Sequence, residues 1–264
     1  MGFSPLPMWQ NPLKLLKIES DEIHVWLLPL EVDPFVINHL RQILTEDERT
    51  RANRFRFERH RNRFIVARGL LRVTLALYLK KNPIDLIFIY NEYGKPALAN
   101  HSSESRLQFN VSHSHVLALF GITLNHEIGI DIERIRSDFA DIKIAQRFFS
   151  PHEVEVLMSL PEAIQKSAFF NCWTRKEAFI KAKGKGLSIP LSQFDVSLAP
   201  DEPAALLAVK NEPQEASRWL LYNLDPGDDY KAALAVEKNN WQLKYWKWTE
   251  QSIYQTLINS EFLK

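Results

Sequence analysis

Two long helical patterns, each followed by short apolar runs, dominate the chain. Residues 61–79 place apolar side chains on one stripe at helical spacing, namely Phe64, Ala67, Leu71, Leu75 and Tyr78. This pattern predicts a long helix that ends before Asn82-Pro83, and a second is expected from Pro161-Glu162 to Gly184. Shorter helices are predicted over 33–44, after a capping box at 45–48, over 142–149 and from Ser150-Pro151.

Strands are expected where apolar residues cluster or alternate over a few positions. The predicted strands are 23–28, 86–90, 107–111, 116–122, 128–132, 194–198, 219–224 and 231–236. We interpret Ser112-His113-Ser114-His115 as the link between two of them, and 91–96 as a tight turn. Each half of the chain thus offers a strand, a long helix with basic residues and several further strands. The pattern predicts an α+β fold built as a pseudo-twofold duplication of two similar α/β halves.

The same pattern suggests how the chain is divided. We expect an N-terminal arm over 1–20, an N-terminal α+β half over 21–125 and a C-terminal α+β half over 126–240. Residues 241–264 form an aromatic, amphipathic tail that the pattern does not assign to either half.

Composition adds limits to this picture. A chain of 264 residues with 45% apolar content can bury a sizeable core, and its net charge of +1 does not mark it as a nucleic-acid or membrane binder. Cys172 is the one cysteine, so an intramolecular disulfide is impossible, which fits a reducing compartment. With no signal-peptide pattern and no apolar run of membrane length, we expect a soluble cytoplasmic protein.

The candidate chemistry begins with two acidic segments. In Gly129-Ile130-Asp131-Ile132-Glu133 the two carboxylates share one face of a strand, where like charges are unfavourable without a compensating cation. On the second long helix, Glu177 and Lys181 are one turn apart. Each motif alone has an ordinary explanation, an edge strand facing solvent or a surface ion pair worth about 0.3–0.5 kcal/mol. Together they predict an oxygen cage for Mg²⁺ with a lysine for phosphate or for proton donation.

A basic segment precedes these acids. Between residues 48 and 72 nine arginines stand against two glutamates. Three interpretations remain open: a solvated helix face, a nucleic-acid patch, or a site for one highly charged small ligand. Histidine-based metal chemistry is not supported, because no His/Cys spacing resembles a zinc site, and Cys172 is expected to be a packing residue.

In this order the motifs resemble a known family. Phe109-Asn110-Val111-Ser112-His113-Ser114, the acidic strand, Arg147-Phe148-Phe149-Ser150, the segment 173–181 and Gly184-Lys185-Gly186-Leu187 are similar to motifs of the Sfp-type 4′-phosphopantetheinyl transferases. The turn Tyr93-Gly94-Lys95-Pro96 and the arginine-rich helix match as well, and the resemblance covers residues 45–198. It implies transfer of 4′-phosphopantetheine from coenzyme A to a serine of an apo acyl or peptidyl carrier protein, with release of adenosine 3′,5′-bisphosphate. Coenzyme A is then expected in the cleft between the two halves.

The resemblance also implies roles for individual residues. Asp131, Glu133 and Glu177 fall on the Mg²⁺ ligands, with Glu177 as the candidate base and Lys181 as the catalytic lysine that contacts the phosphates. Further contacts to coenzyme A fall on Arg51, at the 3′-phosphate, and on Lys95, Pro96, Ser112 and His113. Glu48 stands where some members carry a lysine.

Partners and rival functions follow from the same motifs. We expect a monomer that binds neither nucleic acid nor membrane and meets the carrier around 139–160, with Lys143 and Arg147 facing acidic residues. Fatty-acid, polyketide and non-ribosomal peptide synthases all remain open as pathways. The rival functions are another Mg²⁺-dependent phosphotransferase or phosphodiesterase, and an RNA-binding module.

Overall fold

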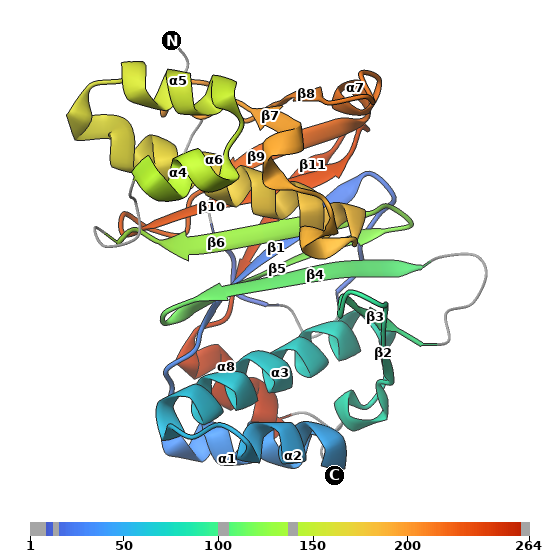
Figure 1. Ribbon diagram of the computed structural model, residues 1–264. Helices are drawn as coiled ribbons and strands as arrows, with labels where there is room; N and C mark the ends of the chain where they lie inside the picture. Colours follow the sequence, from blue (N-terminus) through green and yellow to red (C-terminus); the bar gives the residue numbers. More distant parts are fainter. Residues whose placement is uncertain (1–8, 13–15, 100–105, 137–141, 260–264) are drawn as a thin grey trace.

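The computed structural model describes residues 9–12, 16–99, 106–136 and 142–259 and arranges them in four layers (Figure 1). Two sheets pack face to face and helices cover the outer face of each. The strand order of the first sheet is β11 (Gln242–Lys247), β1 (Glu22–Pro29), β5 (Leu117–Leu124), β4 (Leu107–Ser114). The order of the second is β6 (Ile128–Arg134), β10 (Tyr230–Glu237), β9 (Trp219–Leu224). Pairing is antiparallel except between β1 and β11.

Helices form the two outer layers. The first sheet is covered by α3 (Glu58–Leu79); α1 (Pro34–Gln42) and α2 (Glu46–Asn53) pack against α3, and α8 (Glu250–Asn259) packs against α1. The second is covered by α6 (Glu162–Lys183), with α4 (Ile142–Phe148) and α5 (Pro151–Ser159) beside it. Both α3 and α6 have 22 residues, so each half is a sheet with one long helix on its outer face. This arrangement confirms the predicted α+β fold.

Smaller elements complete the chain. Two hairpins are formed by β2 (Phe88–Tyr90) with β3 (Pro96–Leu98) and by β7 (Phe194–Val196) with β8 (Leu206–Val209). One-turn helices lie at Pro83–Asp85, Gly186–Ser188 and Leu191–Gln193, and α7 (Glu215–Arg218) precedes β9. None of the helices in the described ranges is long and apolar enough to cross a membrane.

Alternation along the strands builds the core between the layers. Ile23, Val25 and Leu27 of β1 point between the two sheets, whereas Trp26 and Leu28 point toward α3. The strand therefore has apolar side chains on both faces, as expected for a strand in the interior of a four-layer structure.

The acidic strand follows the same rule. Ile128, Ile130 and Ile132 of β6 are fully buried between the sheets. The alternate residues, which include Asp131 and Glu133, therefore lie on the face that α6 covers. Period-two alternation thus decides that the carboxylates meet the second long helix.

Helix ends agree closely with the predicted signals. Thr45 and Glu48 form the expected capping box at α2, and Ser150 with Pro151 starts α5 through a second one. Helix α3 ends at Leu79, and the next residue, Lys80, forms its C-cap with a left-handed backbone (φ 51°).

Two predicted features were wrong or incomplete. The segment Ser112–Ser114 is not a link but the end of β4, and the hairpin turns at the next two residues, where His115 has φ 54°. The tail adds β11 in parallel to β1, with Trp246 stacked on Trp26, and α8 packs against α1. The chain thus returns to its first half after completing the second.

Candidate active site

Close contact between β6 and α6 creates the site. At Gly129 a Cβ atom would collide with the backbone of Ala178 and Ala182, so only glycine allows the helix to lie this close to the strand. The contact places Glu177 and Lys181, which immediately precede Ala178 and Ala182 in α6, beside the acidic face of β6.

Lys181 is bound to the first of the strand carboxylates. Its Nζ lies 2.6 Å from Asp131 Oδ1 and 3.0 Å from Ser112 Oγ, and the Ser112 hydroxyl donates to the same Asp131 oxygen at 2.8 Å. Asp131 is 3% exposed, and its other oxygen, Oδ2, is buried with no hydrogen-bond partner among the described residues. A buried carboxylate oxygen without a donor is costly unless a ligand binds it.

Burial and the nearby negative charge of Asp131 raise the pKa of the other two carboxyl groups, Glu177 and Glu133. Burial, and next the charge of Asp131, raises the pKa of Glu177 from 4.5 to about 7, against the opposing effect of Lys181. Burial and Asp131 also raise the pKa of Glu133, although the Ser114 hydroxyl donates to its Oε2 at 2.8 Å. One ammonium therefore does not compensate three neighbouring carboxylates.

The donor atoms suit a hard cation, although they are not gathered around one point. Within the described residues no group of three or more His, Cys, Asp or Glu side chains is close enough to hold a metal ion. Lys181 instead occupies one oxygen of Asp131. Carboxylate oxygens, one of them unpartnered, are nonetheless the ligands that Mg²⁺ prefers, and it needs only one or two of them because it keeps several waters.

Sequence reasoning did not select two further residues of β4. Asn110 and Ser114 lie two residues before and two residues after Ser112. Their side chains accept hydrogen bonds from backbone amides of β6. The signal that could have found them is the two-residue spacing of these polar side chains, which matches the spacing of the acidic strand. His113, between them in the chain, is exposed, and desolvation of its ring followed by the Lys181 ammonium lowers its pKa.

Lys95 lies at the opposite end of β6, where the strand begins, and Pro96 follows it in the β2–β3 hairpin. Lys95 Nζ contacts Glu127 Oε2 (3.0 Å) and the carbonyls of Ile128 (3.2 Å) and Ala182 (3.1 Å), so it ties the β2–β3 turn to the start of β6 and the end of α6. Pro96 pairs with Tyr90 in the hairpin. Ile128 is three residues before Asp131, or about 10 Å along a strand, so Lys95 and the carboxylates lie on either side of the close contact between Gly129 and α6.

The basic segment is divided between surface and core. Arg51 is exposed on α2, with its guanidinium 5.4 Å from the ring centre of Phe64. Glu48 is buried between Arg68 (2.5 Å) and Arg72 (2.7 Å). Burial opposes its ionisation, but the two guanidiniums outweigh this and lower the pKa of Glu48. Glu48 therefore stabilises the first half as a buried ion-pair centre.

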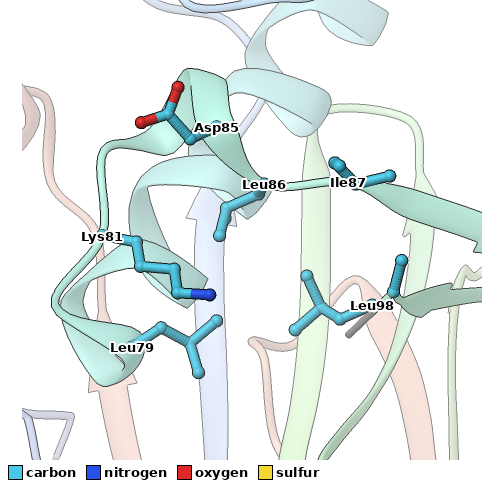
Figure 2. Close-up of a pocket in the computed structure, with 7 residues that line it drawn as sticks. Leu79, Lys81, Asp85, Leu86, Ile87 and Leu98 are labelled. Atoms are coloured by element: carbon cyan, nitrogen blue, oxygen red, sulfur yellow. The ribbon is translucent and has the colours of Figure 1, made fainter. Parts of the chain in front are cut away.

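Two further features, Cys172 and a small pocket, do not contribute to the site. Cys172 is fully buried and its burial raises the pKa of the thiol, in agreement with the expected packing role. Figure 2 shows a small pocket beside the β2–β3 hairpin, and none of the predicted site residues lines it. Its lining residues are Leu79, Lys81, Asp85, Leu86, Ile87, Leu98 and Ala99.

Comparison with known proteins gives a consistent result. Residues 127–235 match the family model described as 4′-phosphopantetheinyl transferase superfamily, and residues 34–121 match the model for 4′-phosphopantetheinyl transferase, N-terminal. The chain is 42% identical over 231 residues to the 4′-phosphopantetheinyl transferase HetI of Nostoc sp. (strain PCC 7120), which covers 88% of this chain and 94% of that protein. It is 32% identical to the 4′-phosphopantetheinyl transferase Sfp of Bacillus subtilis (strain 168), covering 73% of this chain and 82% of that one.

A solved structure aligns over a shorter part. The holo-[acyl-carrier-protein] synthase of Thermotoga maritima matches 43% of this chain and 63% of its own, with 21% identity and a TM-score of 0.34.

Proposed function

The chain belongs to the 4′-phosphopantetheinyl transferase family, and from this premise we propose that it uses Mg²⁺ at Asp131, Glu133 and Glu177 for the transfer. Membership makes it a transferase that moves phosphopantetheine from coenzyme A to a carrier protein. The metal, the role of each residue and the class of carrier are the parts we propose. A monomeric state and a cytoplasmic location stay predictions of the sequence.

The observation that carries the metal proposal is the uncompensated charge of the carboxylates. Within the part of the chain that the structure describes, Asp131 Oδ2 is buried without a hydrogen-bond partner, and the pKa of Glu177, raised first by burial and then by the negative charge of Asp131, reaches about 7. When bound there, Mg²⁺ would neutralise both these groups and the pyrophosphate of coenzyme A.

The reaction needs a proton acceptor and a cation beside the leaving group. The carrier's serine oxygen forms a bond to the phosphorus that bears pantetheine, while the bond from that phosphorus to the oxygen of adenosine 3′,5′-bisphosphate breaks. We assign the serine proton to Glu177, the carboxylate that α6 carries beside Asp131, Glu133 and Lys181. Lys181, 28% exposed at its side chain, is assigned to the charge that develops on the leaving phosphate.

The remaining proposed contacts to coenzyme A come from the β2–β3 hairpin, from β4 and from α2. We propose that Lys95, Pro96, Ser112 and His113 contact coenzyme A and that Arg51 contacts its 3′-phosphate. Support comes from the β2–β3 turn, whose Lys95 contacts the start of β6, and from β4, whose Ser112 contacts Asp131. The nucleophile is the serine of the carrier protein, so this chemistry needs no catalytic thiol. The buried position of Cys172 agrees with this.

The carrier surface is proposed on α4 and α5. Lys143 and Arg147 are exposed and one turn apart on α4, a spacing that suits an acidic helix of the partner. Phe139, the first residue of the predicted surface, lies outside the described residues.

The test is a transfer assay with coenzyme A, Mg²⁺ and a panel of apo carrier proteins from fatty-acid, polyketide and non-ribosomal peptide synthases. Mass spectrometry should show one carrier gaining phosphopantetheine and the release of adenosine bisphosphate. Chelation with EDTA should stop the reaction, and Asp131→Ala should abolish it while the fold stays intact. Transfer at the wild-type rate by Asp131→Ala would remove the proposed metal site.

A further inference from the structure

Strands β4 and β6 join the two sheets without a backbone ladder. They run side by side in the same direction, and side chains of β4 accept hydrogen bonds from backbone amides of β6. The bonds are Ile130 N to Asn110 Oδ1 (2.9 Å), Ile132 N to Ser112 Oγ (3.4 Å) and Arg134 N to Ser114 Oγ (3.0 Å). In each bond the β6 residue comes 20 positions after the β4 residue. Every second side chain of β4 therefore accepts the hydrogen bond that a backbone carbonyl would accept in a regular sheet.

Two of these three side chains also contact a carboxylate. Ser112 donates to Asp131 and Ser114 donates to Glu133, each at 2.8 Å. A serine hydroxyl has one proton, and an incoming amide occupies one of its acceptor sites. The backbone of β6 therefore helps to orient each hydroxyl toward the carboxylate one residue earlier. At the third position, Asn110, the residue that corresponds to these carboxylates is Gly129, which has no side chain.

We propose that Ser114 is a positioning residue for Glu133 in the transfer reaction. This inference rests on the proposed metal set. Glu133 reaches the site through three rotatable side-chain bonds, and it is only half-buried. The Ser114 hydroxyl holds Oε2, so Oε1 is the oxygen left to bind the cation. Hydrogen bonds to a metal-binding carboxylate typically change metal affinity or activity by about 10–100-fold.

The chain offers a matched control for a purely structural role. Ser114→Ala removes one bond to the β6 backbone and one to a carboxylate, whereas Asn110→Ala removes only the backbone bond. Ser114→Thr keeps the hydroxyl and should restore the wild-type behaviour. A role limited to joining β4 and β6 would affect both alanine variants alike.

The experiment measures binding as well as activity. Mn²⁺ binding is followed by electron paramagnetic resonance with adenosine 3′,5′-bisphosphate present, alongside the Mg²⁺ concentration for half-maximal transfer and the Tm without metal. We expect Ser114→Ala to weaken cation binding about 10-fold and Ser114→Thr to stay within about twofold of wild type. Asn110→Ala should lower the Tm but leave cation affinity unchanged. On a Glu133→Gln background, Ser114→Ala should add less than about twofold, because the affected carboxylate is already altered.

The outcomes separate this inference from the proposed function. Wild-type protein that transfers without any divalent cation would overturn the metal set itself. If the wild type needs Mg²⁺ but Ser114→Ala and Asn110→Ala weaken binding equally, or neither does, the positioning role is refuted alone. Should Ser114→Ala not fold, Ser114→Cys, with its weaker donor, is compared with Ser114→Thr. Equal cation affinity of these two would count against the inference.

Discussion

Replacing Glu177 by glutamine should stabilise the ion-free protein while it abolishes transfer. In the folded protein Glu177 holds a proton up to about pH 7, mainly because of burial and then because of Asp131, whereas an unperturbed glutamate loses it near 4.5. Between these two values the folded state binds more protons than the unfolded chain, so the contribution of Glu177 to stability falls as pH rises. Glutamine resembles the protonated form and avoids this loss.

The size of the effect follows from the two pKa values. At 1.36 kcal/mol per pKa unit, a rise from 4.5 to about 7 corresponds to roughly 3 kcal/mol. Solvent screening at a half-buried carboxylate reduces this, so we expect about 1–2 kcal/mol. The stability of Glu177→Gln relative to wild type should therefore grow by that amount from pH 5 to pH 8.5. For a protein of this size it corresponds to about 2–4 °C in Tm.

The assay is urea and thermal unfolding in EDTA at both pH values, with Glu155→Gln as a control. Glu155 is exposed on α5, so the same change of side chain should give the same small effect at both pH values. Mg²⁺ added at pH 8.5 should narrow the difference, because it binds the folded wild type. Transfer by Glu177→Gln should fall by about 100-fold or more. If its relative stability does not rise with pH, burial and the charge of Asp131 do not raise the pKa of Glu177 in the folded protein, and our reasoning is wrong.

Three further predictions concern the second half of the chain. Lys176 Nζ lies 2.7 Å from Glu153, both fully buried, so Lys176→Met should cost about 3–5 kcal/mol in urea unfolding, and adding Glu153→Gln should recover part of it. Gly129→Ala should force β6 and α6 apart, with a destabilisation of about 3 kcal/mol or more by the same assay and loss of Mn²⁺ binding. Reversing charge in Lys143→Glu together with Arg147→Glu should raise KM for the carrier about 10-fold; an equal rise in KM for coenzyme A would contradict a carrier surface.

Local patterns in the sequence predicted much of the site. The alternation in β6 correctly put Asp131 and Glu133 on one face of that strand, and the helical spacing put Glu177 and Lys181 on one face of α6. Gly129 was visible before these acids, but its close contact with α6 depends on how two distant segments pack. Short-range periodicity determines which side chains share a face, whereas it does not determine what that face meets.

The Ser112–Ser114 segment shows why other parts could not be predicted. Serine and histidine in succession are typical of a turn, yet here the serines replace backbone carbonyls along a second strand. That role depends on β6 lying beside β4, which nothing in the local sequence reveals. In the same way, β11 pairs with β1 from more than two hundred residues away, so the pattern of the tail alone could not assign it. Glu48 was visible as part of a capping box, but its two arginine partners come from the next helix.

A count of charges links the proposed metal to the proposed base. With all groups ionised, Asp131, Glu133 and Glu177 carry −3 and Lys181 carries +1. The net charge of the site, where β4 and β6 join the two sheets, is then −2. A proton on Glu177 changes this to −1, so the neighbouring negative charge adds to burial, the larger cause, in raising the pKa of Glu177 in the ion-free protein. A divalent cation would remove the imbalance entirely, and a monovalent one would leave half of it. Coenzyme A brings further negative charge, so Lys181 is then better placed on the phosphates than on Asp131. The arrangement that costs stability without ligands is therefore the one that favours binding of Mg²⁺ and coenzyme A together.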